Sequence, residues 1–152
     1  MSPDYGTLKF EHFISKLRSG QIALGLFEAL PEVMFWIKDQ TGVIIFANRA
    51  CAEVLCATPE NLVGKTDHEL YPEAMAEVYK EDDEKVFRTG KAMHNKLELL
   101  TRPGGAIEWR MASKIPLFDL NDVVIGTAGI SRRLEHGEGP PLPTPHLSLI
   151  HI

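Results

Sequence analysis

The stretch from Val33 to Leu55 constrains the fold most strongly, because it contains two adjacent strand-like runs that are apolar on both sides. Val33–Lys38 and Val43–Ala47 are short and rich in β-branched and aromatic residues. Asp39–Gly42 lies between them and has Asp first and Gly last, which is typical of a hairpin built on a type I turn. Side chains alternate between the two faces of a strand, so these runs carry apolar groups on both faces. We therefore expect the hairpin to lie inside a larger sheet that is covered on both sides.

The bulk composition is that of an ordinary globular domain. The chain has 152 residues, of which 44% are hydrophobic and 24% are charged, enough for one domain with a real core. The net charge of −5 provides no basic surface for phosphates, so we expect no direct nucleic-acid binding. The sequence has neither an apolar run of about 18 residues nor a signal-peptide pattern, so we expect no membrane association. Cys51 and Cys56 form neither a disulfide framework nor a metal site, and a cytoplasmic location follows as the expectation.

Two helical pieces precede the hairpin. Between Leu8 and Leu30 apolar residues recur at helical spacing, Ser19 and Gly20 interrupt the pattern, and Pro31 ends it. We expect residues 1–30 to form an N-terminal helical extension. Its apolar stripe is suited to cover one side of the sheet or to pack against a second copy of itself.

Several helices are expected after the hairpin. Asn48 has the side chain of an N-cap for a helix over Arg49–Leu55, and Thr58 precedes Pro59 in the same way for a single helical turn. A capping box over residues 66–69 starts another short helix. Residues 72–89 then read as one longer helix that ends at a glycine.

Three further strands are predicted over Met93–Leu100, Ile107–Pro116 and Val123–Ser131, separated by turn sequences. Together the segments describe an α+β domain over residues 31–133 with a five-stranded antiparallel sheet and helices inserted between its second and third strands. Residues 134–152 have the Pro- and Gly-rich composition of a linker leading to an output element.

The order of these segments resembles a PAS domain, also called a sensory-box domain. The similarity runs from Glu28 to Arg133 and is carried by FWIKDQTGVIIFANRA, VGKTDHELYP, EDDEKVFRTG, GGAIEWRMASKIPLFD and VVIGTAGISR. The resemblance implies a PAS-like sheet order of 2-1-5-4-3 and a pocket between the sheet and the inserted helices. It also implies a role as a sensor or dimerisation module that precedes an output domain.

The cofactors of this family are not expected here. Haem-binding PAS domains hold the iron with a His on the long helix, but residues 72–89 contain none and His68 is the only nearby candidate. The light-sensing members use a Cys where this chain has Asp67, and the companion amides for the flavin ring are also missing. The six His residues lack the helical spacing of metal ligands. We therefore expect no haem, flavin or metal, and at most an unidentified small molecule.

The candidate pocket residues come from the strands and helices that the resemblance places around it. On the strand Ile107–Pro116, Glu108, Arg110, Ala112 and Lys114 form one alternating set, which the resemblance turns toward the pocket. If the facing were reversed, Trp109 and Met111 would line an apolar pocket instead. The ten candidates for ligand binding are Met34, Trp36, Lys38, Cys51, His68, Tyr79, Asp82, Arg110, Ala112 and Ala128.

Asp82 interrupts the apolar stripe of the long helix, and a polar residue there needs a hydrogen-bond partner. We expect Arg110 and Asp82 to point toward each other, with Trp36 as one wall of the pocket. The basic residues then either form internal salt bridges or bind a small anionic ligand.

Three functions are compatible with this pattern. The first is a cytoplasmic sensory PAS domain that regulates an attached output domain of the transcription-regulator or histidine-kinase type. The second is a ligand-free module for homodimerisation or partner docking. The third, a small α+β enzyme, lacks any convincing constellation of catalytic residues, so we expect no enzyme. In either of the first two cases we expect a homodimer through the N-terminal helices and the outer face of the sheet.

Overall fold

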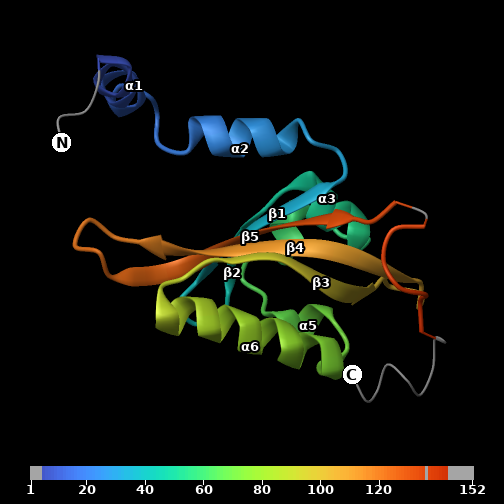
Figure 1. Cartoon of the computed structure of the whole chain (residues 1–152). Helices are drawn as coiled ribbons and strands as arrows, with labels where there is room; N and C mark the ends of the chain where they lie inside the picture. Colours follow the sequence, from blue (N-terminus) through green and yellow to red (C-terminus); the bar gives the residue numbers. More distant parts are fainter. Residues whose placement is uncertain (1–4, 136, 144–152) are drawn as a thin grey trace.

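A computed structural model of the chain describes residues 5–135 and 137–143 (Figure 1). The predicted ends of the chain, at residues 1–4 and 144–152, and His136 lie outside the described residues. In chain order the elements are α1 (Tyr5–Ser15), α2 (Gln21–Glu28), β1 (Val33–Asp39), β2 (Ile44–Ala47), α3 (Arg49–Val54), α4 (Pro59–Leu62), α5 (Asp67–Leu70), α6 (Glu73–Thr89), β3 (Met93–Thr101), β4 (Ile107–Phe118) and β5 (Val124–Arg133). All the predicted segments between residues 5 and 133 are present, with ends shifted by one to three residues.

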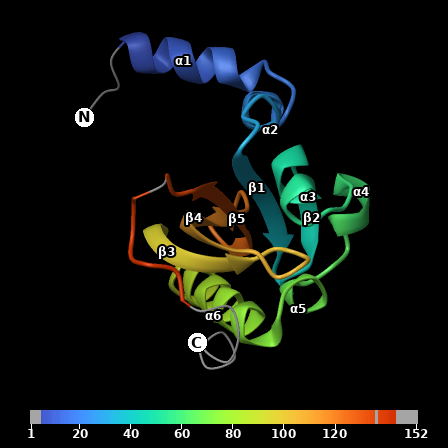
Figure 2. The same ribbon diagram turned by 90° about the vertical axis from the view of Figure 1, so that its right-hand side faces the viewer.

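The five strands form one antiparallel sheet in the order β2-β1-β5-β4-β3, as predicted. Figures 1 and 2 show α1 and α2 on one side of the sheet and α5 and α6 on the other, while α3 and α4 lie beside β2. The first and last strands are neighbours in the middle of the sheet, which explains why β1 is apolar on both faces. The face covered by α6 is called the inner face below, and the face toward α2 the outer face.

The β1–β2 turn has the hydrogen bonds that its sequence predicts. The amide of Gly42 donates to the carbonyl of Asp39 at 3.1 Å, and Gly42 has a φ of 83°, which suits glycine. The carboxylate of Asp39 accepts from the amides of Thr41 at 2.8 Å and Val43 at 3.1 Å. These bonds lower the pKa of Asp39, with the Thr41 hydroxyl making the largest contribution.

Asn48 joins three elements at the end of this hairpin. Its Oδ1 accepts from the amide of Cys51 at 3.2 Å, which caps α3, and from the amide of Phe35 in β1 at 3.1 Å. Its Nδ2 donates to the carbonyl of Val33 at 2.8 Å and to that of Phe27 in α2 at 3.2 Å. The side chain is buried, and every polar atom in it has a partner, so Asn48 fixes α2 and α3 against β1.

The outer face of the sheet is only partly covered. Phe27 of α2 stacks on Phe35 of β1, with ring centroids 4.3 Å apart. Further along the sheet, apolar side chains are exposed to solvent: Ile115 by 43% and Ile130 by 38%. The chain thus leaves an apolar surface next to α2 without a partner among the described residues.

Candidate functional site

The burial pattern of β4 confirms which of its faces is turned toward the helices. Glu108, Arg110, Ala112 and Lys114 are all buried, and the alternate residues are more exposed. The reversed arrangement, with Trp109 and Met111 lining the pocket, is therefore wrong. Charged side chains can lie on this buried face because they meet opposite charges there: Lys114 meets Asp83 of α6 and Glu98 of β3, and Arg110 meets Glu108.

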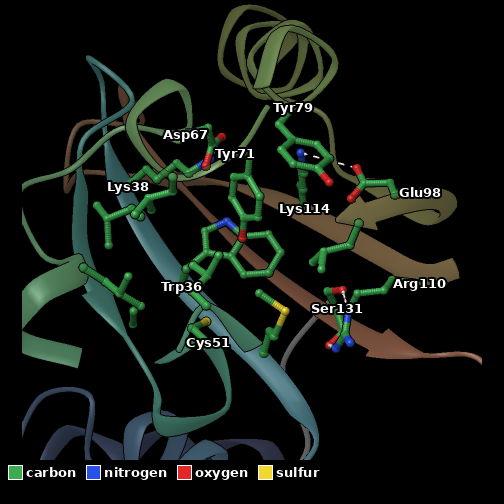
Figure 3. Close-up of a pocket in the computed structure, with 17 residues that line it drawn as sticks. Trp36, Lys38, Cys51, Asp67, Tyr71, Tyr79, Glu98, Arg110, Lys114 and Ser131 are labelled. Atoms are coloured by element: carbon green, nitrogen blue, oxygen red, sulfur yellow. Dashed lines mark hydrogen bonds and ion pairs between the residues drawn. The ribbon is translucent and has the colours of Figure 1, made fainter. Parts of the chain in front are cut away.

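A small cavity lies between the inner face of the sheet and helices α5 and α6 (Figure 3). It has room, about 40 Å³, for a few water molecules. Six of the ten predicted candidates line it, namely Met34, Trp36, Lys38, Cys51, Tyr79 and Arg110. Lys114, which was expected on the pocket side although it is not among the ten candidates, also lines the cavity. The polar and aromatic lining residues that the sequence reasoning missed are Asp67, Tyr71, Glu98 and Ser131.

The other four candidates lie outside the cavity. Ala128 pairs with Ile37 and Ile115 across the strands, so its side chain is on the outer face, and its assignment to the pocket side was wrong. The error arises because a single strand rich in small residues gives no sign of which face is turned inward. Ala112 is on the inner face and is fully buried, but it packs below the cavity lining.

His68 and Asp82 are directed to other partners. His68 is partly exposed, and its Nε2 lies 2.6 Å from a carboxylate oxygen of Glu77. Asp82 binds Lys96 of the edge strand β3 at 2.5 Å. Neither side chain lines the cavity.

The predicted pair between Arg110 and Asp82 is wrong. The guanidinium of Arg110 donates instead to the hydroxyl of Ser131 at 2.6 Å and to its carbonyl at 2.9 Å, and it contacts Glu108 at 3.4 Å. Burial lowers the pKa of Arg110, and Glu108 opposes that shift. Arg110 lies on β4 opposite Arg133 at the end of β5, and Asp82 pairs instead with Lys96 of β3.

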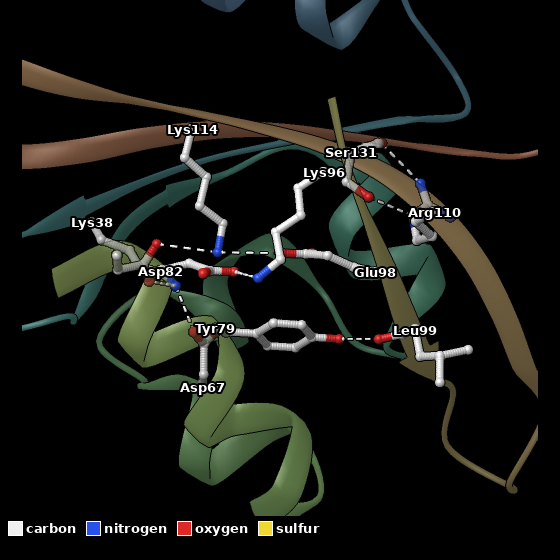
Figure 4. Close-up of polar contacts among 11 residues, drawn as sticks. Lys38, Asp67, Tyr79, Asp82, Lys96, Glu98, Leu99, Arg110, Lys114 and Ser131 are labelled. Atoms are coloured by element: carbon white, nitrogen blue, oxygen red, sulfur yellow. Dashed lines mark hydrogen bonds and ion pairs between the residues drawn. The ribbon is translucent and has the colours of Figure 1, made fainter. Parts of the chain in front are cut away.

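The charged partner on α6 is the next residue, Asp83. Lys38 of β1 donates to Asp83 at 2.6 Å and to Asp67 of α5 at 2.5 Å (Figure 4). Lys114 of β4 lies 3.3 Å from the same Asp83 and 3.6 Å from Glu98 of β3. These five side chains form a buried charge network that connects α5 and α6 to three strands.

The network keeps Lys38 charged although it is buried. Burial alone would lower the pKa of Lys38, but the carboxylates of Asp67 and Asp83 outweigh it and raise the pKa above its ordinary value. Glu98 shows the opposite balance, because burial raises its pKa and Lys114 compensates only in part. Glu98 is therefore the member of the network whose charge is least well stabilised.

The hydroxyl and thiol groups near the cavity are held in their neutral forms. Burial raises the pKa of Tyr71 and Tyr79 and brings that of Cys51 to about 11. The hydroxyl of Tyr79 donates to the carbonyl of Leu99 at 2.6 Å. Tyr71 and Tyr79 meet edge to face, with ring centroids 5.2 Å apart, and so form an aromatic wall.

Neither flavin nor a metal ion fits these residues. Asp67, which stands where the light-sensing relatives have a thiol, is committed to Lys38, and the cavity is far smaller than an isoalloxazine ring requires. Within residues 5–135 and 137–143, no three His, Cys, Asp or Glu side chains come together in a way that could hold a metal ion. In the same part of the chain, no helix is both long and apolar enough to cross a membrane.

A five-stranded antiparallel sheet with a cavity under its inserted helices is the arrangement of a PAS domain, and the comparison with known families agrees. The PAS fold family matches residues 27–135, so the chain belongs to that family. No curated protein matches the sequence.

Solved structures give more specific similarities. VqmA bound to DPO is 28% identical, with a TM-score of 0.65 over 77% of this chain and 58% of that one. A structure of the Vibrio cholerae VqmA dimer in the absence of target DNA is 27% identical, with a TM-score of 0.67 over 84% of this chain and 56% of that one. The chain thus spans somewhat more than half the length of these VqmA structures.

The PAS domain of Bordetella pertussis BvgS is a more distant neighbour. It is 15% identical, with a TM-score of 0.53 over 77% of this chain and 86% of that one. At this identity the likeness concerns the fold alone.

Proposed function

We propose that this chain is the sensory domain of a regulator, and that it binds a small molecule in the cavity between the sheet and α6. The observation that carries the proposal is the cavity itself, in which apolar walls surround a few buried polar groups, as in binding sites for small ligands. The similarity to VqmA bound to DPO supports the same conclusion. The alternative, a dimerisation module without a ligand, would have this space filled by side chains.

The output that we propose is transcription regulation. VqmA is described as a dimer with a target DNA, which favours the transcription-regulator output over the histidine-kinase one. The net charge of −5 is unsuited to DNA contact by this domain, so we assign such contact to an attached output domain. The proposal includes a cytoplasmic location and no catalytic role.

We also propose that the domain acts as a homodimer through α1, α2 and the outer face of the sheet. The exposed apolar side chains on these elements support it: Phe10 is exposed by 64%, Phe13 by 61% and Leu26 by 62%. Apolar surface of this kind on neighbouring elements is normally buried by a partner.

Native mass spectrometry of the purified chain, followed by a thermal-shift titration with DPO, tests the ligand-binding function. We expect either a retained small molecule or a rise in melting temperature with DPO, because a ligand that binds only the folded state stabilises it. If no mass is retained and DPO leaves the melting temperature unchanged, the ligand-free dimerisation module becomes the better assignment.

A further inference from the structure

The positively charged groups at the cavity already have acceptors from the protein. Lys38 is bound by two carboxylates, at 2.5 Å and 2.6 Å. Arg110 is bound by Ser131 and contacts Glu108, and Lys114 is paired with Asp83, which it shares with Lys38, and with Glu98. A small anion entering the cavity would have to displace one of these buried carboxylates, so the basic residues do not form an anion site.

Two fully buried polar atoms at the cavity lack a hydrogen-bond partner in the described structure. The indole Nε1 of Trp36 is a buried donor, and Oε1 of Glu98 is a buried acceptor that Nζ of Lys114 approaches only to 3.6 Å, too far for a hydrogen bond. Both residues line the cavity (Figure 3), and the side chain of Glu98 is only 9% exposed. A buried polar group without a partner costs about 1–3 kcal/mol, so each of these atoms favours a ligand that satisfies it.

Trp36 cannot satisfy its donor by moving into the sheet. Its indole lies directly against Gly129, the residue opposite it on β5, where even a Cβ atom would overlap the ring. The ring therefore remains on the inner surface of the sheet, with its N–H available to the cavity.

From these two atoms we infer the chemical class of the ligand: an uncharged molecule that donates a hydrogen bond to Glu98 and accepts one from Trp36. This inference rests on the proposed ligand-binding function and specifies what that ligand must present. An uncharged ligand takes the place of the small anionic ligand that the basic residues of the sequence had indicated.

Nε1 of Trp36 and Oε1 of Glu98 together disfavour both anionic and cationic ligands. A carboxylate has only acceptors, so it could meet Trp36 but would face the carboxylate of Glu98 in a low-dielectric site. An amidinium has only donors, so it could meet Glu98 but would leave Trp36 unsatisfied and add charge beside Lys114. A primary amide has both a donor and an acceptor and carries no charge, so it matches both atoms.

Two matched sets of probes separate these classes. Acetamide, acetate and acetamidinium are small enough for the existing space, and benzamide, benzoate and benzamidinium add a ring for the aromatic wall. Each is titrated at millimolar concentration against the whole chain in a thermal-shift assay, since fragments of this size bind weakly. We expect at least one amide to raise the melting temperature, and its carboxylate and amidinium analogues to raise it less.

Conservative variants connect the preference to the two residues. Glu98→Gln keeps the shape of the side chain and removes the carboxylate, and Trp36→Phe keeps an aromatic ring and removes the N–H; each should weaken amide binding by roughly 10-fold. Glu98→Gln should also improve binding of the carboxylate analogue, because its amide can donate to it. Trp109→Phe is the matched control, since the Nε1 of Trp109 is likewise buried without a partner but does not face this cavity.

Stabilisation by a carboxylate equal to or greater than that by its amide would overturn the inference. So would amide binding that Glu98→Gln and Trp36→Phe leave unchanged, or a screen in which no probe binds. The DPO titration and native mass spectrometry are independent of these probes. If they detect a ligand while the amide probes fail, the sensory function is retained and only this chemical class of ligand is rejected.

Discussion

Trp36 and Gly129 are cross-strand neighbours, and the indole of Trp36 occupies the space in which a side chain at position 129 would lie. The ring covers β5 at the centre of the inner face and forms the floor of the cavity. Glycine is needed at position 129 to admit a tryptophan at position 36.

We therefore expect Gly129→Ala to destabilise the domain by about 1–3 kcal/mol, the usual cost of overpacking a close contact. Chemical denaturation measures the loss. In a Trp36→Ala background the same substitution should cost much less, with a coupling energy in the range of about 0.5–3 kcal/mol. Gly25→Ala is the control: nothing lies within 4 Å of a Cβ at this position in α2, and alanine favours a helix, so this change should be neutral or stabilising. Equal losses at positions 129 and 25 would contradict the argument.

The fold could be predicted from the sequence because its signals are local. The Asp39–Gly42 turn, the Asn48 cap and the end of α6 at Gly90 each lie within a few residues of the groups that they bind. The order of strands then followed from the family resemblance.

The cavity could be predicted only in part, because its polar contacts depend on non-local register. Asp82 and Asp83 are adjacent in sequence, and only the crossing of α6 over the sheet decides that Asp83 meets Lys38 and Lys114. Glu98 was missed because nothing in the sequence of its own strand shows that it lies opposite Arg110, on the inner face of the sheet.

Lys38 should be essential to the stability of the domain. Its side chain is 4% exposed, and Lys38→Met would leave Asp67 and Asp83 buried with one cation fewer. Breaking a buried ion pair in this way costs about 3–5 kcal/mol, and urea denaturation would show it. Lys80→Met is the control, because Lys80 is 55% exposed and lies 4.0 Å from Glu84, so its loss should cost less than about 1 kcal/mol. A comparable effect at both lysines would show that the buried network contributes no more than a surface pair.

Glu98 should make the stability of the unliganded domain fall as pH rises. Burial raises its pKa in the folded state, as do Asp82 and Asp83, and Lys114 and Lys96 oppose this in part. The folded state thus holds the proton more tightly than the unfolded chain, where a Glu has a pKa of about 4.3. This contribution to stability is complete below the unfolded pKa and is lost as pH rises through the folded pKa.

Glu98→Gln removes that titration because its side chain stays neutral. The difference in unfolding free energy between variant and wild type should therefore move in favour of the variant as pH rises from about 4.3 toward neutrality. Thermal or urea unfolding over a pH series measures it, with Glu84→Gln as an exposed control. A difference that is constant with pH, or that favours the wild type increasingly, would contradict the assignment.

Asn48 should stabilise the domain through both ends of its amide. Asn48→Ala removes all four hydrogen bonds and should cost about 2–4 kcal/mol, since a lost N-cap and newly unsatisfied buried groups add together. Asn48→Asp retains the acceptor for the amides of Phe35 and Cys51 but loses both donated bonds. It also places a carboxylate beside the carbonyls of Val33 and Phe27, so we expect it to be destabilising too. Denaturation curves within about 0.5 kcal/mol of wild type for both variants would show that the clamp is dispensable.

The dimer proposed on the outer face should be disrupted by a single charge there. Phe13 on α1 and Ile130 on β5 are exposed by 61% and 38%, and a dimer that buries them cannot accommodate a lysine without a partner. We expect the wild-type chain to sediment as a dimer at micromolar concentration, and Phe13→Lys or Ile130→Lys to shift it to the monomer. Leu120→Lys is the matched control, because Leu120 is fully exposed in the β4–β5 turn and stands apart from α1 and α2. A monomeric wild-type chain would contradict the dimer. Dissociation by Leu120→Lys alone would show that the interface lies elsewhere.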